Sequence, residues 1–114
     1  GKNKARLKVA RARYEQEVYS YQKVVLSAFK DVNDAIVTIR KAKEVRQSYE
    51  KLLAAADTYL ELAQLQYING VTSYMDVLDA QRGLLDAQLS LNNAMLDELL
   101  SSVNLYKALG GGYQ

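Results

Sequence analysis

The chain has 114 residues without proline, cysteine, histidine or tryptophan, and it is 49% hydrophobic and 25% charged with a net charge of +2. This composition is typical of long helices, and it excludes disulfides, thiolate metal sites and chemistry that needs histidine or cysteine. No segment approaches the roughly 20 apolar residues of a membrane-spanning helix, and no apolar signal core follows the N-terminus. We therefore expect a soluble all-α fragment of a longer protein.

A heptad pattern predicts one long helix from about residue 4 to residue 67. Small, aromatic or leucine side chains recur every seven positions from Leu7 to Ala63, and a second row four positions further on contains mostly valine, isoleucine and leucine. Only Arg11 and Arg46 interrupt that second row. Because residues three and four apart share one helix face, the rows predict a coiled-coil seam about 90 Å long. Apolar residues off this seam predict a second neighbour. They are Leu26, Phe29, Ile36 and Val37.

A second helix is predicted from about residue 74 to residue 109. It also repeats a small residue every seven positions, with apolar residues beside this row. The small row is Ala80, Ala87, Ala94, Ser101 and Ala108, and beside it lie Val77, Leu78, Leu84, Leu85, Leu91, Leu99, Val103 and Leu105. Ser73 or Thr72 can cap the start of the helix, where Asp76 suits the helix dipole. The glycines at 110–112 predict its end.

A tip of about residues 68–73 joins the two helices. Its glycine, Gly70, can adopt the positive φ that a tight turn between antiparallel helices often needs, and Asn69 tolerates it next best. The predicted fold class is therefore all-α, a long antiparallel coiled-coil hairpin that forms one unit over residues 1–114. The N-terminal half of the first helix, roughly Leu7 to Ala35, has no partner within this chain, so we expect the fragment to self-associate.

The sequence offers little support for enzyme or metal chemistry. Carboxylates lie three residues apart in two pairs, and such pairs can bind a cation or share a proton. The pairs are Asp31 with Asp34 and Asp76 with Asp79. Neither has a histidine partner, and no glycine-rich phosphate loop is present. The basic run at 2–13 lacks interleaved aromatic residues and is interpreted as a solvated helix end, with lipid or phosphate contact as the alternative. We predict no enzyme, metal, cofactor or nucleic-acid partner.

A motif at the tip is more specific. The segment from Tyr67 to Arg82 reads Tyr-x-x-Gly-x-x-Ser-Tyr-x-Asp-Val-Leu-Asp-Ala-Gln-Arg, and the segment at 105–112 reads Leu-Tyr-Lys-Ala-Leu-Gly-Gly-Gly. Two upstream segments, at 10–16 and 25–35, look like the long descending helix of the same family. Together these segments make the chain resemble the TolC-like outer-membrane efflux proteins over nearly its whole length.

The resemblance implies a trimeric duct whose α-barrel crosses the periplasm of a Gram-negative bacterium beneath the outer membrane. This chain would be one hairpin of that barrel, a passive conduit for drugs or other small molecules that works with a periplasmic adaptor and an inner-membrane pump. By matching positions, the entrance and its ion selectivity would involve Asp76, Asp79 and Tyr67. The adaptor-contacting tip would comprise Asn69, Gly70, Val71, Thr72 and Ser73.

Alternatives remain open at this point. Asp76 and Asp79 can instead serve helix-capping chemistry, which explains Asp76 better than Asp79. Some relatives place an arginine at the tip to hold the entrance closed, but this chain has Thr72, so no gating salt bridge is expected there. Tyr67 can still hydrogen-bond across the helices. A free-standing coiled-coil scaffold that binds a helical partner is the alternative function, although it would need neither the tip motif nor the glycine-rich ending.

Overall fold

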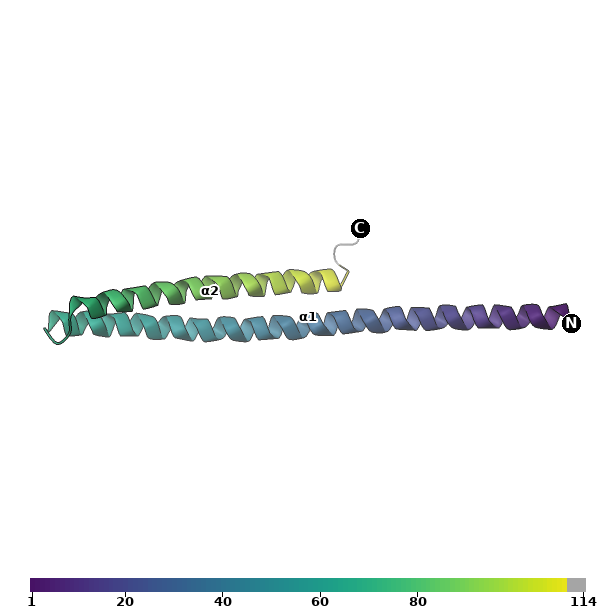
Figure 1. Cartoon of the computed structure of the whole chain (residues 1–114), viewed down its shortest axis with the longest axis horizontal. Coiled ribbons are helices and arrows are strands. Elements are labelled where there is room, and N and C mark those ends of the chain that lie inside the picture. The colour runs from purple at the N-terminus through teal and green to yellow at the C-terminus, as the bar shows by residue number, and fades with distance from the viewer. Residues whose placement is uncertain (111–114) are drawn as a thin grey trace.

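The computed structural model describes residues 1–110 and contains two helices, α1 (Lys2–Ile68) and α2 (Tyr74–Ala108). They run antiparallel and side by side in a rod of 103 × 25 × 15 Å (Figure 1). The predicted fold class, an all-α helical hairpin, is confirmed. Figure 1 also shows that α2 accompanies only the C-terminal half of α1 and that the N-terminal half continues alone.

The core of the hairpin is a narrow seam between the two helices. Its buried apolar residues each expose 4% or less of their surface, and they are Ala63, Val77, Ala80, Ala87 and Ala94. The predicted small row of α2 is therefore buried from Ala80 to Ser101, and Ala108 at its end is half-buried. The Ser101 hydroxyl donates to the carbonyl oxygen of Asp97 at 2.8 Å, so this polar side chain is satisfied within its own helix. Small side chains along the seam allow the two backbones to lie close together.

The apolar residues beside these alanines fall on two faces of α2. Buried or half-buried positions recur every seven residues at Val77, Leu84, Leu91, Glu98 and Leu105. Four other apolar residues beside the small row are exposed, namely Leu78, Leu85, Leu99 and Val103. A step of one residue turns a helical side chain by roughly 100°, so neighbours of seam residues point away from the partner helix. These exposed residues belong to a second apolar face of α2.

On α1, burial follows the extent of α2. The seam positions from Ala35 to Leu60 are half-buried and Ala63 is buried, whereas Tyr14 and Tyr21 are 68% and 71% exposed. The prediction that the N-terminal half of α1 has no partner within the chain is confirmed for residues 1–110. The off-seam residues Leu26, Phe29, Ile36 and Val37 are exposed, as expected.

Both helices end on a glycine with positive φ. Gly110 has φ +78° and donates its N–H to the carbonyl oxygen of Lys107 at 3.0 Å, so it terminates α2 as predicted. Gly111 and Gly112, which were part of the same prediction, lie outside the described residues. Neither described helix combines the length and apolar character needed to cross a membrane.

Candidate functional site

The hairpin tip begins with the way in which α1 ends. Gly70 has φ +73°, which confirms the role predicted for this glycine. Its N–H donates to the carbonyl oxygen of Tyr67 at 3.0 Å, and the N–H of Val71 donates to that of Gln66 at 2.8 Å. This pair of bonds is the Schellman arrangement, which satisfies the last carbonyls of a helix while reversing the chain. The turn is therefore held by backbone bonds that set a positive φ at position 70, which favours glycine.

The other tip residues complete the two helix ends. Asn69 keeps φ at −85°, and its side-chain amide donates to the carbonyl oxygen of Leu65 at 2.8 Å. Ser73 is the N-cap residue of α2, although its hydroxyl makes no capping bond, and its carbonyl oxygen accepts the N–H of Asp76 at 3.1 Å. The Thr72 hydroxyl oxygen is buried and has no hydrogen-bond partner among residues 1–110. The tip thus combines a fixed backbone with one unsatisfied hydroxyl.

Two tyrosines connect the helices beside the turn. The rings of Tyr67 and Tyr74 have their centroids 5.3 Å apart and are tilted by 57°, a favourable geometry for aromatic pairs. Within the described chain, the link between Tyr67 and α2 is therefore ring packing and not the hydroxyl hydrogen bond that the sequence allowed. Val71, between the two tyrosines in the sequence, is 70% exposed.

Asp76 and Asp79 are both exposed, and Asp76 lies in the first turn of α2. Neither forms a salt bridge within residues 1–110. They begin a row of polar or small residues, alternately three and four positions apart, which we call the acidic stripe. It comprises Asp76, Asp79, Gly83, Asp86, Ser90, Asn93 and Asp97. Such spacing places the side chains along one helix face. The stripe as a whole was not predicted, although its three-four spacing is visible in the sequence.

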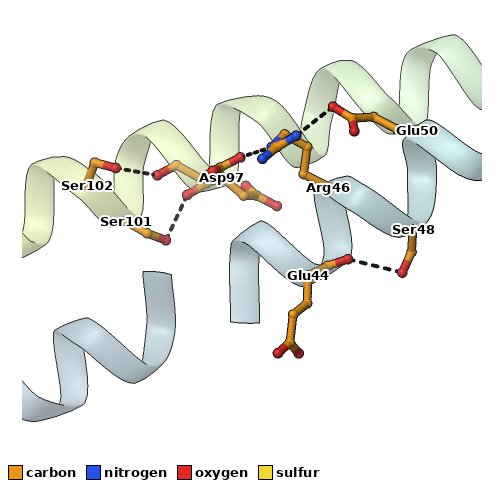
Figure 2. A network of polar contacts seen from close by, with 8 residues as sticks. Glu44, Arg46, Ser48, Glu50, Asp97, Ser101 and Ser102 are labelled. Carbon is orange, nitrogen blue, oxygen red and sulfur yellow. Dashed lines mark hydrogen bonds and ion pairs between the residues drawn. The ribbon is translucent and has the colours of Figure 1, made fainter. Parts of the chain in front are cut away.

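A charged layer crosses the seam far from the tip. Arg46 on α1 donates from Nε to Glu98 on α2, and from Nη1 to Oε1 of Glu50 at 2.6 Å. Figure 2 shows Arg46 extending from α1 toward α2, with Glu50 one turn along its own helix. Only 22% of the Arg46 side chain and 24% of the Glu98 side chain are exposed. The hydrogen bond to Glu98, followed by that to Glu50, raises the pKa of Arg46 above its ordinary value.

This layer explains why both apolar rows are interrupted. Arg46 occupies a seam position of α1, and Glu98 occupies the corresponding position in the row of α2. The two charges therefore meet each other instead of facing apolar side chains. Glu98 was not predicted as a seam residue, although it is the one charged residue in an otherwise apolar heptad row of α2, as Arg46 is a charge in the row of α1. Within residues 1–110, no cluster of three or more potential metal ligands is present.

Comparisons with known proteins agree with the tip motif. Residues 1–111 match the family model of the outer membrane efflux protein family. The probable outer membrane lipoprotein SilC of Salmonella typhimurium is 35% identical over 113 residues, which cover 99% of this chain and 24% of SilC. The solvent efflux pump outer membrane protein SrpC of Pseudomonas putida is 39% identical over 113 residues, covering 99% of this chain and 24% of SrpC.

A third relative is named for the efflux of cations instead of solvents. The cation efflux system protein CusC of Escherichia coli O6:H1 is 33% identical over 114 residues, covering all of this chain and 25% of CusC. The chain spans about a quarter of the length of the curated relatives that it matches. The family match nevertheless extends over nearly every residue, including the tip and the helix that precedes it, and the chain belongs to the outer membrane efflux protein family.

Proposed function

We propose that this hairpin forms part of the wall and the periplasmic entrance of an outer-membrane efflux channel. The family match over residues 1–111 carries the proposal, and the relatives are named as outer-membrane components of efflux systems. A rod 103 Å long that buries one narrow seam is suited to lie among neighbours in a tubular wall. The chain then supplies wall and entrance for passive conduction and no bond-making chemistry.

Two faces of α2 are exposed, one polar and one apolar, and a helix in a channel wall borders both a water-filled interior and neighbouring helices. We assign the acidic stripe to the water-filled interior, where rows of carboxylates favour cations. We assign the second apolar face to neighbouring helices of the wall, because large exposed apolar surfaces in water normally mark contacts. That face includes Leu78, Leu85, Leu89, Leu96, Leu99 and Val103.

The tip suits the entrance of the conduit. In a homotrimer, threefold symmetry would bring three copies of Asp76 and Asp79 around one axis, while the Tyr67–Tyr74 ring pair fastens the helices at the same end. We assign residues 69–73 to contact with a periplasmic adaptor, which connects the channel to an inner-membrane pump. The exposed Val71 offers this contact an apolar side chain. Because Thr72 is uncharged, it supplies no gating salt bridge.

Ion selectivity of the complete channel tests the entrance. In planar bilayers, replacing Asp76 and Asp79 together by asparagine is expected to lower the preference for cations over anions. Replacing Asp86 and Asp97 is expected to lower it further, because the stripe continues inward. Asp57→Asn is the matched control, since Asp57 is an exposed carboxylate of α1 outside the stripe. Unchanged selectivity in both stripe variants, with assembly intact, would mean that the stripe lies outside the conduit.

Efflux in cells tests the tip. Gly70→Val in the full-length channel is expected to reduce drug tolerance, because a β-branched residue is strained at φ +73° and distorts the adaptor-contacting turn. Gly83→Ala is the control, because Gly83 lies inside α2 away from the tip and does not have a positive φ. If the Gly70 variant is present at wild-type abundance and drug tolerance is normal, the tip does not make the proposed contact with the adaptor. A full-length protein that confers no efflux at all would favour the coiled-coil scaffold.

A further inference from the structure

The hairpin tip contains an asparagine, Asn69, that is followed directly by a glycine, Gly70. Asparagine is a thermolabile residue, because the carbonyl carbon of its side chain can be attacked by the backbone nitrogen of the next residue. The attack releases ammonia and forms a cyclic succinimide. A glycine in the second position favours the reaction, since no Cβ obstructs the approach of its nitrogen. The tip therefore carries the pair of residue types at which this reaction is least hindered.

The location of Asn69 distinguishes it from the other asparagines of the chain. It is exposed, and it lies just beyond the last residue of α1. The others all lie inside helices and precede residues that have a Cβ, and they are Asn3, Asn33, Asn92, Asn93 and Asn104. The fixed dihedral angles of a helix keep the following backbone nitrogen away from the side-chain carbonyl carbon. Sequence and location therefore both favour the reaction at Asn69.

The turn in its folded conformation hinders the reaction. The N–H of Gly70 donates to the carbonyl oxygen of Tyr67 at 3.0 Å, and this bond disfavours loss of its proton. The Asn69 side-chain amide donates to the carbonyl oxygen of Leu65 at 2.8 Å, which holds the side chain against α1. The ψ angle of Asn69 is 5°, so the Gly70 nitrogen lies nearly eclipsed with the backbone nitrogen of Asn69. Ring closure needs that nitrogen beside the Cβ of Asn69 instead.

Deamidation would weaken the turn that hinders it. Hydrolysis of the succinimide gives aspartate or isoaspartate at position 69. Both products lose the amide that donates to Leu65, and both place a negative charge at the C-terminus of α1, where the helix dipole disfavours it. Isoaspartate also adds one methylene group to the main chain, inside the segment that both Schellman hydrogen bonds span. The modified turn is therefore less stable than the original one.

We propose that Asn69 is a site of spontaneous deamidation whose rate is set by opening of the hairpin tip. In the open turn, the Gly70 nitrogen loses its proton to hydroxide and attacks Cγ of Asn69. The bond from Cγ to the amide nitrogen breaks, and that nitrogen takes up a proton and leaves as ammonia. One water molecule then opens the ring at either carbonyl carbon, so the net change needs no oxidant and no cofactor. This inference rests on the tip geometry and is independent of the proposed channel function.

Ageing of the purified whole chain tests the site. Samples are kept at mildly alkaline pH with and without guanidinium chloride, and tryptic peptides are analysed by mass spectrometry that separates aspartate from isoaspartate. Deamidation of Asn69 is expected to be at least about tenfold faster in the unfolded chain, because the reaction there needs no opening step. In the folded chain, Asn69 is expected to react before the helical asparagines.

Matched variants locate the control at the turn. Tyr74→Ala removes the ring packing that joins the helices beside the turn, and it is expected to speed the folded-state reaction at least about threefold without changing the rate in guanidinium chloride. Tyr19→Ala removes an exposed tyrosine far from the tip and is expected to change neither rate. Gly70→Ala is expected to slow the reaction in guanidinium chloride, because its methyl group obstructs the attacking nitrogen.

A product mimic tests the effect on the turn. Asn69→Asp is expected to unfold at a lower temperature than Asn69→Ala, because alanine removes only the donor whereas aspartate also adds the charge. A midpoint for Asn69→Asp at or above that of Asn69→Ala would contradict the weakening of the turn. Equal deamidation rates in the folded and unfolded chains would overturn the proposal. So would an Asn69 that stays intact in guanidinium chloride, or a folded chain in which Asn92 or Asn93 reacts as fast as Asn69.

Discussion

The two halves of α1 share one heptad seam and differ in whether a second helix covers it. From about residue 35 to residue 68, α2 fills the seam, Ala63 is buried and Arg46 is paired. From Lys2 to about residue 34 the helix continues without a break, and its side chains lie exposed except for the half-buried Val25 and Val32. The comparison shows that a heptad pattern specifies a surface for packing, whereas the chain connectivity decides which part of that surface is filled.

Hydrogen exchange is expected to give the largest contrast between the halves. Amides of the covered half are held by tertiary packing, whereas an uncovered helix depends on intrinsic propensity, which is marginal in water. We expect amides around residues 45–63 to exchange at least about a hundredfold more slowly than those around residues 8–25. Equal protection in a chain shown to be monomeric would contradict the comparison.

A matched pair of alanines measures packing at equivalent seam positions. Ala63 is 4% exposed, and Ala28 lies five heptads earlier on the uncovered half. Ala63→Leu is expected to lower the free energy of unfolding by about 1–3 kcal/mol, because the seam has no room for a larger side chain. Ala28→Leu is expected to change it by less than about 0.5 kcal/mol. Urea unfolding followed by circular dichroism checks both values, and similar losses would show that both positions are packed.

Arg11 and Arg46, which interrupt the same heptad row of α1, provide a second matched pair. Arg46→Leu is expected to destabilise the hairpin, because it leaves Glu98 without its partner. The loss is expected to be smaller than that of Ala63→Leu, because the Glu98 side chain is 24% exposed and stays in contact with water. Adding Glu98→Leu is expected to recover most of the loss, because two apolar side chains then face each other. Arg11→Leu is expected to leave stability unchanged. Thermal unfolding of the three variants measures the differences, and a loss at Arg11 as large as that at Arg46 would contradict them.

The pH dependence of the Arg46 contribution follows from the direction of its shift. The folded hairpin raises the pKa of Arg46, so the stabilisation is fully present below the ordinary arginine value and is lost only as pH rises through the higher folded value. The difference in stability between wild type and Arg46→Leu is therefore expected to show no arginine titration from neutral pH into mild alkali. Unfolding curves recorded across that pH range measure this difference. If it falls with a midpoint in mild alkali, a group other than Arg46 is titrating.

Two glycines give the smallest and most local effects. Gly70→Ala is expected to cost about 1 kcal/mol, because φ is +73° there even though the added side chain meets no atom within 4 Å. Gly83→Ala is expected to stabilise α2 by about 0.5–1 kcal/mol, since Gly83 lies inside a helix and has open space around it. A lower unfolding midpoint for Gly70→Ala and a higher one for Gly83→Ala would show that the positive φ at the tip, and not glycine in general, is what the fold needs.

Parts of the candidate site were accessible from the sequence and others were not. Gly70 was predicted because only glycine adopts positive φ without strain. The ring packing of Tyr67 on Tyr74 was not predicted, because it depends on how closely the turn returns α2 to α1. The seam position of Glu98 was not predicted, because a charge in a heptad row can only be placed once its partner is known. The roles of Asp76 and Asp79 remain predictions that the bilayer measurement addresses.

The sequence by itself determined the two helices, the glycine turn and the alanine row, because each depends on interactions within a few residues or on a repeat along one face. It also determined the family, through motifs at the tip and in the helix before it. Only the tertiary structure decided that Val77, Leu84 and Leu91 face the seam while their neighbours Leu78 and Leu85 do not. It also decided that Arg46 is paired while Arg11 is uncovered, because burial depends on which surfaces the antiparallel return of α2 reaches.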